Sequence, residues 1–291
     1  MPNFERLLSD MFEADIYAGK RLFFIQGIWR SGTSWLGRMI GSHPKIYVCQ
    51  HELQSFMRGL TITQFGRPLE THPFLNERYN TSRKIGFLSS LMHLYRHEKP
   101  AATRIGERSP GGDVNLIKAN FPDAKFVIIC RDGRDICVST AYLDEMVSKA
   151  SSYLLEGEEG PRIEPSYLKE MARLYATYVQ DYFTLRERHP ADVLLIRYED
   201  LHCGTIPVMQ RVFKFLDMRT VPEVVEEICR KHSFAAEAKR QPGDEDRNAL
   251  IRKGIVGDWK NYFSAACTSA FQEIAGEALR LAGYELMGGS Q

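Results

Sequence analysis

The sequence predicts an α/β fold of three layers, in which a central, mostly parallel β-sheet is flanked by helices. Short apolar runs alternate with longer amphipathic stretches, which is the pattern of parallel strands connected by helices. The 291 residues are 44% hydrophobic and 26% charged, as in an ordinary globular protein. No internal repeat or low-complexity tract divides the chain, so residues 1–291 are expected to form one domain.

Four apolar runs are the candidate strands of this sheet. The first is 21–28, which is followed by a candidate helix over 33–42. Residues 103–106 form a weaker run. The segments 125–130 (KFVIIC) and 193–198 (VLLIRY) are almost continuously apolar, as expected of strands that are buried on both faces.

Longer segments carry apolar residues at helical spacing. These predicted helices are 167–189, 221–232 and 265–282, and Gly283 ends the last one. Tyrosines recur along the first of them, and such an aromatic stripe is more often part of a core than of a ligand pocket. Two polar segments that contain Pro and Gly, 157–165 and 239–247, are predicted to be irregular.

Charge and cysteine content exclude several classes of protein. Lys plus Arg (38) and Asp plus Glu (37) nearly cancel, which argues against a protein that coats nucleic acid. No run of 18 apolar residues predicts a membrane span, and the acidic, amphipathic start of the chain does not resemble a signal peptide. The six cysteines show no Cys-x-x-Cys pair and no zinc-ligand spacing. We therefore expect reduced thiols, a cytoplasmic location and no metal site.

The loop after the first predicted strand is the first candidate phosphate site. Gly27 and Gly32 have the spacing of a phosphate-binding P-loop, and a helix follows. A P-loop requires Lys after the second Gly, but this position holds Thr33, and Arg30 supplies a cation earlier in the loop. A plain strand-to-helix turn with a Ser or Thr cap is the alternative interpretation.

Two further segments carry cations at positions that suit an anion. Arg131 follows the buried strand 125–130, at the edge where open α/β sheets bind ligands, and Ser139 lies eight residues later. Near the C-terminus, Arg252-Lys253-Gly254 precedes Gly257-Asp258-Trp259, which suits a loop that closes over a phosphate. Taken singly, the first could be a structural salt-bridge cluster and the second a solvated basic turn.

Together and in this order, the three segments resemble the sulfotransferases that use 3′-phosphoadenosine-5′-phosphosulfate (PAPS). The nucleotide-binding elements would span about 21–42, 125–142, 193–200 and 250–261. The resemblance implies a fold like that of the P-loop NTPases. It also implies transfer of a sulfuryl group to an acceptor hydroxyl or amine, release of 3′-phosphoadenosine-5′-phosphate (PAP), and no requirement for a metal.

The resemblance also assigns expected roles to individual residues. The residues expected to hold the 5′-phosphosulfate are Arg30, Ser31, Gly32, Thr33 and Ser34. Those expected around the adenine are Trp35, which would stack on it, and Tyr198. Those expected to hold the 3′-phosphate are Arg131, Ser139, Arg252, Lys253 and Gly254.

The acceptor side departs from the pattern of many cytosolic members. Their catalytic histidine on the third strand is missing from Gly106-Glu107-Arg108-Ser109-Pro110. This segment resembles branches in which a cation at that place holds the sulfuryl group, so Arg108 is a candidate. The resemblance then implies Glu52 as the base, with His51 as the alternative, although both could be surface residues.

Several questions stay open at this stage. A P-loop kinase of a small molecule is disfavoured by Thr33, and a nucleotide-binding scaffold without catalysis remains an alternative. The acceptor could be a small molecule, a glycan, a lipid or a peptide. The dimer motif of cytosolic members is absent from 263–276, so the oligomeric state is not predicted.

Overall fold

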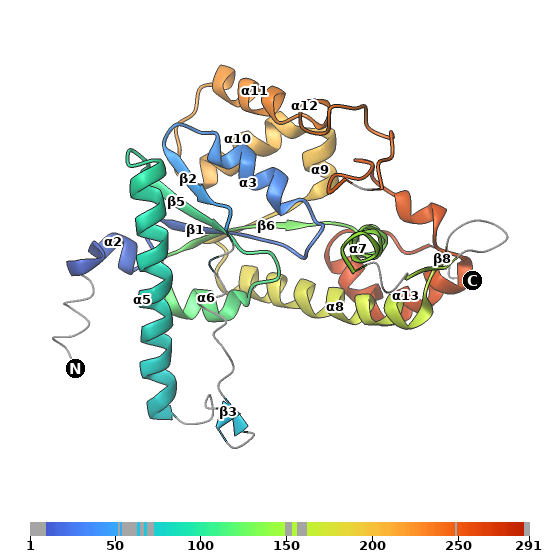
Figure 1. Cartoon of the computed structure of the whole chain (residues 1–291), viewed down its shortest axis with the longest axis horizontal. Helices are drawn as coiled ribbons and strands as arrows, with labels where there is room; N and C mark the ends of the chain where they lie inside the picture. Colours follow the sequence, from blue (N-terminus) through green and yellow to red (C-terminus); the bar gives the residue numbers. More distant parts are fainter. Residues whose placement is uncertain are drawn as a thin grey trace.

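A computed structural model describes residues 10–51, 53, 63–64, 67–68, 73–148, 153–155, 162–247 and 249–287. Its centre is a five-stranded sheet with the strand order β2-β5-β1-β6-β9, in which every neighbouring pair is parallel. These strands are β1 (Leu22–Gln26), β2 (Ile46–Cys49), β5 (Arg104–Arg108), β6 (Lys125–Cys130) and β9 (Val193–Arg197). Helices lie on both sides of the sheet, which confirms the predicted three-layer α/β class (Figure 1).

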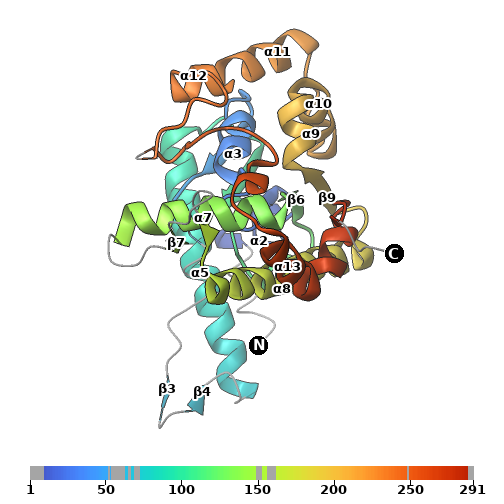
Figure 2. The same ribbon diagram turned by 90° about the vertical axis from the view of Figure 1, so that its right-hand side faces the viewer.

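The helices divide into two groups around the sheet (Figures 1 and 2). On one side lie α3 (Thr33–Gly41), α9 (Tyr198–Cys203), α10 (Thr205–Phe215), α11 (Pro222–Lys231) and α12 (Phe234–Ala238). On the other lie α6 (Val114–Asn120), α8 (Pro165–Arg188) and α13 (Ala265–Leu281). The remaining helices are α2 (Ala14–Tyr17), α5 (Pro73–Glu98), α7 (Gly133–Ser148) and the 3₁₀ helix η2 (Asp258–Asn261).

Two small antiparallel pairs stand apart from the main sheet. They are β3 (Thr63–Gln64) with β4 (Arg67–Pro68), and β7 (Leu154–Leu155) with β8 (Arg162–Ile163). Among the described helices, none is long and apolar enough to cross a membrane. All six cysteines carry free thiols.

The central strands are apolar along their whole length because both of their faces are buried. Successive side chains of a strand point to opposite faces of the sheet. In β6, Val127 and Ile129 pack into the cluster formed with α3 and α10, whereas Phe126 and Ile128 pack into the cluster formed with α8 and α13. The uninterrupted apolar run KFVIIC therefore reflects burial on both faces, as the sequence predicted.

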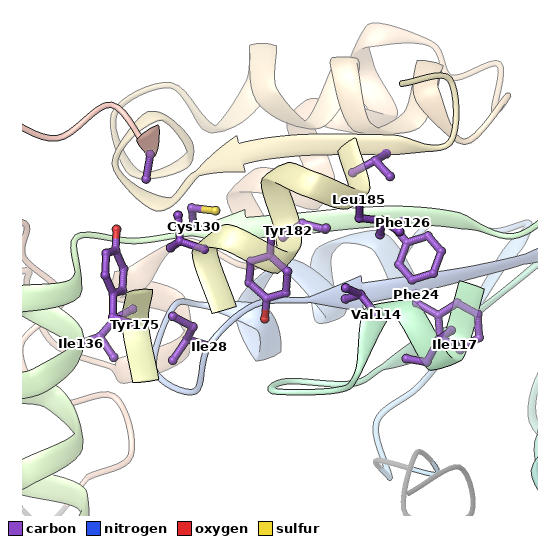
Figure 3. Close-up of a cluster of buried hydrophobic side chains, with 14 of the residues drawn as sticks. Phe24, Ile28, Val114, Ile117, Phe126, Cys130, Ile136, Tyr175, Tyr182 and Leu185 are labelled. Atoms are coloured by element: carbon purple, nitrogen blue, oxygen red, sulfur yellow. The ribbon is translucent and has the colours of Figure 1, made fainter. Parts of the chain in front are cut away.

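The tyrosine stripe of α8 belongs to the core. Tyr175, Tyr182 and Leu185 of this helix are almost completely buried. Figure 3 shows them in the same cluster of side chains as Phe24 and Phe126 of the sheet. The stripe thus fixes α8 to one face of the sheet and leaves the carboxyl edge of the strands open for other residues.

Several elements were missing from the sequence-based prediction, among them β2, α5, α6 and α10. The strand β2 has only four residues, so its apolar run was too short to stand out. The helix α5 spans 26 residues, and the buried ones among its described side chains extend from Phe87 to Tyr95. The three helices predicted in the second half of the chain are confirmed to within two residues at each end.

The close approach of β1 and β5 yields a test of this packing. Phe23 faces Gly106 in the register of the two strands, and a Cβ atom at position 106 would overlap the Phe23 ring. We expect Gly106→Ala to lower the free energy of unfolding by about 1–3 kcal/mol, because the ring must move within a packed core. Chemical denaturation would measure the loss.

Gly276→Ala in α13 is the matched control. A Cβ atom there would meet only Leu286 at ordinary contact distance, and alanine favours a helix interior over glycine by about 1 kcal/mol. This variant should be neutral or stabilised. Equal stability of the two variants would contradict the described register of β1 and β5.

Candidate nucleotide-binding site

The turn from β1 into α3 is shaped by two glycines. A Cβ atom on Gly27 would lie 2.7 Å from the Ile129 carbonyl oxygen. Gly32 has φ +99° at the N-cap of α3, and a Cβ atom there would lie 2.8 Å from the Tyr198 ring. Only glycine fits both places without strain. The loop can therefore wrap closely, and it presents backbone N–H groups at the positive end of a helix, where anions are stabilised.

Arg30 extends from this loop into a cluster of cations. Its Nε donates to the Ser139 hydroxyl at 2.9 Å, and its terminal nitrogen donates to the Leu250 carbonyl at 2.6 Å. Burial, together with the charges of Arg131 and Arg252, lowers the pKa of Arg30 to about 10. The guanidinium stays charged at neutral pH, and none of the described carboxylates forms an ion pair with it. Because its positive charge is not neutralised by a described carboxylate, Arg30 favours the binding of an anion at this place.

Arg131 links the loop to a segment that lies more than a hundred residues away in the sequence. One terminal nitrogen donates to the Arg30 carbonyl at 3.0 Å, and the other to the Ile255 carbonyl at 3.3 Å. Its guanidinium carbon lies 4.5 Å from the centre of the Tyr198 ring, a cation–π distance. Arg131 thus contacts the loop after β1, the Tyr198 ring and the segment around Ile255, and it holds these three parts together.

The loop over 250–261 is attached to α7 through Asp135. The carboxylate of Asp135 accepts the backbone N–H groups of Gly257 at 2.8 Å and of Trp259 at 2.9 Å. Burial raises the pKa of Asp135, while these two bonds and the nearby Arg131 act in the opposite direction. Asp135 thereby sets the position of the loop relative to Ser139, one turn further along the same helix.

Arg252 and Lys253 are both held by Asp258. Lys253 donates to it at 2.8 Å, and Arg252 forms an ion pair with it and another with Glu245. Arg252 also lies 4.2 Å from the centre of the Tyr142 ring. These contacts fix the two cations at the mouth of the cavity without ligand.

Aromatic rings form the part of the cavity that we call its aromatic end. Trp35 donates from its indole nitrogen to the His232 carbonyl at 2.6 Å and packs edge-on against Tyr198 at 6.0 Å. Phe234 lines the same end. Gly254 has φ +64° and lies so close to the Phe234 ring that no side chain would fit there. The aromatic end and the cationic end are therefore parts of one cavity.

Eleven of the residues predicted from sequence line this cavity together. They are Arg30, Gly32, Thr33, Ser34, Trp35, Arg131, Ser139, Tyr198, Arg252, Lys253 and Gly254. Ser31 does not line it, because its buried hydroxyl donates to the Ile28 carbonyl at 2.6 Å. Within the described chain, no group of three His, Cys, Asp or Glu side chains could hold a metal ion.

Of the proposed catalytic residues that the structure describes, Arg30 lines the cavity, whereas Arg108 and His51 do not. Arg108 donates to the side-chain oxygen of Gln50 at 3.2 Å and to its carbonyl at 3.0 Å, beside α3. His51 is exposed and is not among the lining residues. Glu52 lies outside the described residues.

Ten lining residues had no individual role in the sequence-based prediction. Four of them are Arg38, His232, Phe234 and Glu237. Arg38 lies one turn after Trp35 on α3, so a search for polar residues on the same helix face could have found it. The other three lie at or just after the end of a predicted helix, and nothing in their spacing indicated that this segment folds back onto α3.

Known proteins match this chain along most of its length. Residues 20–283 match the family model described as "Sulfotransferase domain". The 3-beta-hydroxysteroid sulfotransferase of Cavia porcellus is 28% identical over 183 residues, which are 57% of this chain and 60% of that protein. Human Sulfotransferase 1E1 is 28% identical over 176 residues, which are 54% of this chain and 56% of that protein. The match thus spans about 60% of the length of these relatives.

Solved structures share the fold at lower identity. Mouse sulfotransferase SULT7A1, complexed with PAP, aligns with a TM-score of 0.57 and 19% identity over 94% of this chain and 89% of that one. Retinol dehydratase in a complex with retinol and PAP gives a TM-score of 0.58 and 19% identity over 94% and 86%. The parallel sheet flanked by helices is therefore the sulfotransferase fold.

The ion pairs of the 250–261 loop predict a specific dependence of stability on pH. Burial alone would raise the pKa of Asp258, but hydrogen bonds from Lys253, Arg252 and Asn261 outweigh it and hold the pKa below the ordinary value of 3.8. A depressed carboxyl pKa stabilises the fold above the ordinary value, and this stabilisation is lost as pH falls through the folded-state pKa.

We expect Asp258→Asn to lower the stability at pH 7 by about 3 kcal/mol, because it removes the more deeply buried of the two carboxylates that pair with Arg252. The variant should also lose part of the decline in stability below pH 4. Denaturation followed between pH 2 and 7 would measure both effects, with the exposed Asp123→Asn as control. A variant whose acid decline matches that of the wild type would contradict the role given to Asp258.

Proposed function

The chain belongs to the sulfotransferase domain family, and we propose on that basis that it transfers a sulfuryl group from PAPS to an acceptor, releasing PAP. The observation that carries this proposal is the single cavity in which Arg30, Arg131 and Arg252 meet the aromatic side chains of Trp35 and Phe234. An adenine nucleotide with two separate anionic groups has the chemistry to fill such a site. Two of the solved structures that share the fold are described as complexes with PAP.

The shape of the cavity fits PAPS at the β1 loop. Gly27 and Gly32 leave the room that a closely approaching phosphosulfate needs, and the α3 N-terminus offers its backbone N–H groups. We assign Arg30, Thr33 and Ser34 to this 5′ group as side chains, and Gly32 as a backbone donor. Ser31, which was expected to join them, directs both its hydroxyl and its backbone N–H to the Ile28 carbonyl, at 2.6 Å and 3.1 Å.

The second anionic group would lie between α7 and the 250–261 loop. Arg131 and Ser139 come from the end of β6 and from α7, and Arg252, Lys253 and Gly254 face them across the cavity. We assign these residues to the 3′-phosphate. The adenine would then lie at the aromatic end, with Trp35, Phe234 and Tyr198 around it. A nucleotide phosphorylated at the 3′ position has the second anionic group that these residues can bind, which is why it is the proposed donor.

In the proposed reaction the acceptor oxygen or nitrogen attacks sulfur, the bond from sulfur to the bridging oxygen breaks, and PAP leaves. Arg30 would stabilise the charge that develops on the sulfuryl and bridging oxygens, together with the N–H groups of the loop. A base takes the acceptor proton, which contributes roughly 10²–10⁴ in rate. Arg30 is already charged and held by Ser139 and Leu250, so little reorganisation is needed.

We propose a small-molecule hydroxyl as the acceptor, in keeping with the steroid sulfotransferases among the relatives. Trp29, which is 38% exposed and packs edge-on against Tyr178 at 6.0 Å, lies next to Arg30 and offers an apolar surface near the reacting group. Arg108 is proposed to reach the sulfuryl group after releasing Gln50. The kinase alternative loses support, because Thr33 takes the place of the P-loop lysine.

We also infer that residues 20–283 act as one domain, since the family match runs through all five strands of the sheet. The six free thiols support a reducing compartment such as the cytoplasm.

The first prediction from this function concerns nucleotide preference. PAP at about 100 times its dissociation constant should raise the free energy of unfolding by about 2.7 kcal/mol, and ATP at the same concentration by much less. The reason is that ATP lacks the 3′-phosphate that Arg131 and Ser139 are proposed to hold. Arg131→Ala should remove the preference, and thermal melts would measure it.

Arg230→Ala is the matched control, because Arg230 is exposed on α11 and pairs only with Glu227 among the described residues. It should leave the preference for PAP intact. Equal protection by ATP and PAP in the wild type would instead favour a kinase.

The second prediction concerns the base. Glu52→Gln should lower kcat by two or more orders of magnitude and leave the affinity for PAP unchanged, because a base acts on the acceptor and not on the nucleotide. His51→Asn should have a much smaller effect. Steady-state kinetics with PAPS and a phenolic acceptor, together with PAP binding, would measure both.

A large loss of kcat in His51→Asn and a small loss in Glu52→Gln would assign the base to His51. Losses of less than about tenfold in both variants would place the base elsewhere. A wild-type protein that binds PAP but transfers nothing to any acceptor would favour the scaffold without catalysis.

A further inference from the structure

Two helices place matched pairs of residues at the aromatic end of the cavity. On α3, Arg38 follows Trp35 by three residues, and on α12, Glu237 follows Phe234 by three residues. Residues at this spacing lie on the same face of a helix. All four side chains line the cavity. On each helix, the aromatic side chain is therefore followed one turn later by a charged side chain. These two charged side chains, Arg38 and Glu237, form an ion pair.

The carboxylate of Glu237 is fixed by three hydrogen bonds. Its Oε1 accepts from Arg38 Nε at 2.8 Å and from His232 Nδ1 at 2.7 Å, and its Oε2 accepts from a terminal nitrogen of Arg38. Burial would raise the pKa of Glu237, but these bonds outweigh it and bring the pKa below its ordinary value. The side chain is only 13% exposed and stays ionised at neutral pH.

His232 is itself held on both sides of its ring. Nδ1 donates to the Glu237 carboxylate, and Nε2 lies within hydrogen-bond distance of the Ser42 hydroxyl, at 2.7 Å. The carbonyl of His232 also receives the indole N–H of Trp35 at 2.6 Å. The carboxylate and the Trp35 ring are thus tied to the same residue, which fixes one relative to the other.

An ionised carboxylate accepts about four hydrogen bonds and donates none. Three of these positions on Glu237 are taken by Arg38 and His232. The fourth position can accept a hydrogen bond from a donor on a ligand. The negative charge of the carboxylate repels an acceptor atom placed there. A flat base between Trp35 and Phe234 would bring its edge toward this group. An exocyclic amine at that edge gains a charge-assisted hydrogen bond, whereas a carbonyl oxygen there faces a buried negative charge.

We propose that Glu237 is the residue that selects a 6-amino purine over a 6-oxo purine, by accepting a hydrogen bond from the exocyclic amine. Arg38 and His232 act as positioning residues that hold the carboxylate in place. This inference rests on the proposed function, since it takes the ligand to be a nucleoside 3′,5′-bisphosphate. It goes further by assigning the choice of base to one side chain.

The test compares adenosine 3′,5′-bisphosphate with inosine 3′,5′-bisphosphate, in which a carbonyl acceptor replaces the 6-amino donor and N1 changes from an acceptor to an N–H donor. Wild-type protein should bind the adenosine compound more tightly by about tenfold or more, as expected when a buried polar group is left unpaired. Glu237→Gln should reduce this ratio to below about threefold, because the amide can also donate to a carbonyl oxygen. Isothermal titration calorimetry would give both dissociation constants.

A second variant separates recognition from a purely structural role. Glu237→Asp keeps the charge but withdraws it by one methylene group, so it should weaken binding of the adenosine compound without improving binding of the inosine compound. Glu227→Gln is the matched control, since Glu227 also accepts two hydrogen bonds from an arginine but is exposed on α11. It should leave the ratio unchanged. A thermal melt of each free variant would confirm that it is folded.

The possible outcomes distinguish this inference from the function on which it rests. If wild-type protein binds both bisphosphates equally, or if Glu237→Gln weakens both by the same factor, the selection by Glu237 is wrong while nucleotide binding stands. If neither compound binds the wild-type protein and Arg131→Ala changes nothing, the proposed function is wrong as well. The inference is supported if the ratio of the two dissociation constants falls in Glu237→Gln and stays unchanged in Glu227→Gln.

Discussion

Repulsion between Arg30, Arg131 and Arg252 is the constraint around which the cavity end of this molecule is organised. The charges of the other two arginines contribute to the lowered pKa of Arg30. The protein offsets the repulsion with buried carboxylates, since Asp135 lies 3.6 Å from Arg131 and Asp258 pairs with Arg252. Arg30 is the exception, because the described chain supplies it only with a hydroxyl and a carbonyl. A bound nucleotide with two anionic groups would complete the neutralisation, so binding and stability are coupled through the same charges.

The parallel sheet brings these charges together. The carboxyl ends of β1, β6 and β9 lie at one edge, and they deliver Arg30, Arg131 and Tyr198 respectively. Ligands of open α/β sheets bind at such an edge. The 250–261 loop has no strand of its own in this sheet, so it depends on Asp135 for its place. A sulfotransferase needs both features, since its donor carries one anionic group at each end of the sugar.

A second buried network holds the C-terminal segment beneath the site. Glu199 accepts from the backbone N–H of Asp132 at 3.1 Å and from the hydroxyl of Tyr284 at 2.7 Å. Arg134 pairs with Asp132 and lies 3.9 Å from the centre of the Trp259 ring. The residues just after β6 and β9 are thereby tied to α13 and to the 250–261 loop. The network therefore anchors the two segments that carry Arg131 and Arg252.

The sequence by itself determined the α/β class, the strands β1, β6 and β9, and eleven of the residues that line the cavity. It could do so because doubly buried strands are continuously apolar and because the loop glycines and the paired cations keep fixed spacings. The sequence did not indicate that Ser31 turns inward or that Arg108 rests on Gln50, since a side chain's direction depends on its neighbours in space. Nor did it reveal Phe234 and Glu237. Their role arises only when the segment after α11 folds back onto α3, almost two hundred residues away, and Glu237 meets Arg38. Local spacing encodes each helix and strand, but only the tertiary structure decides which charged side chains become neighbours.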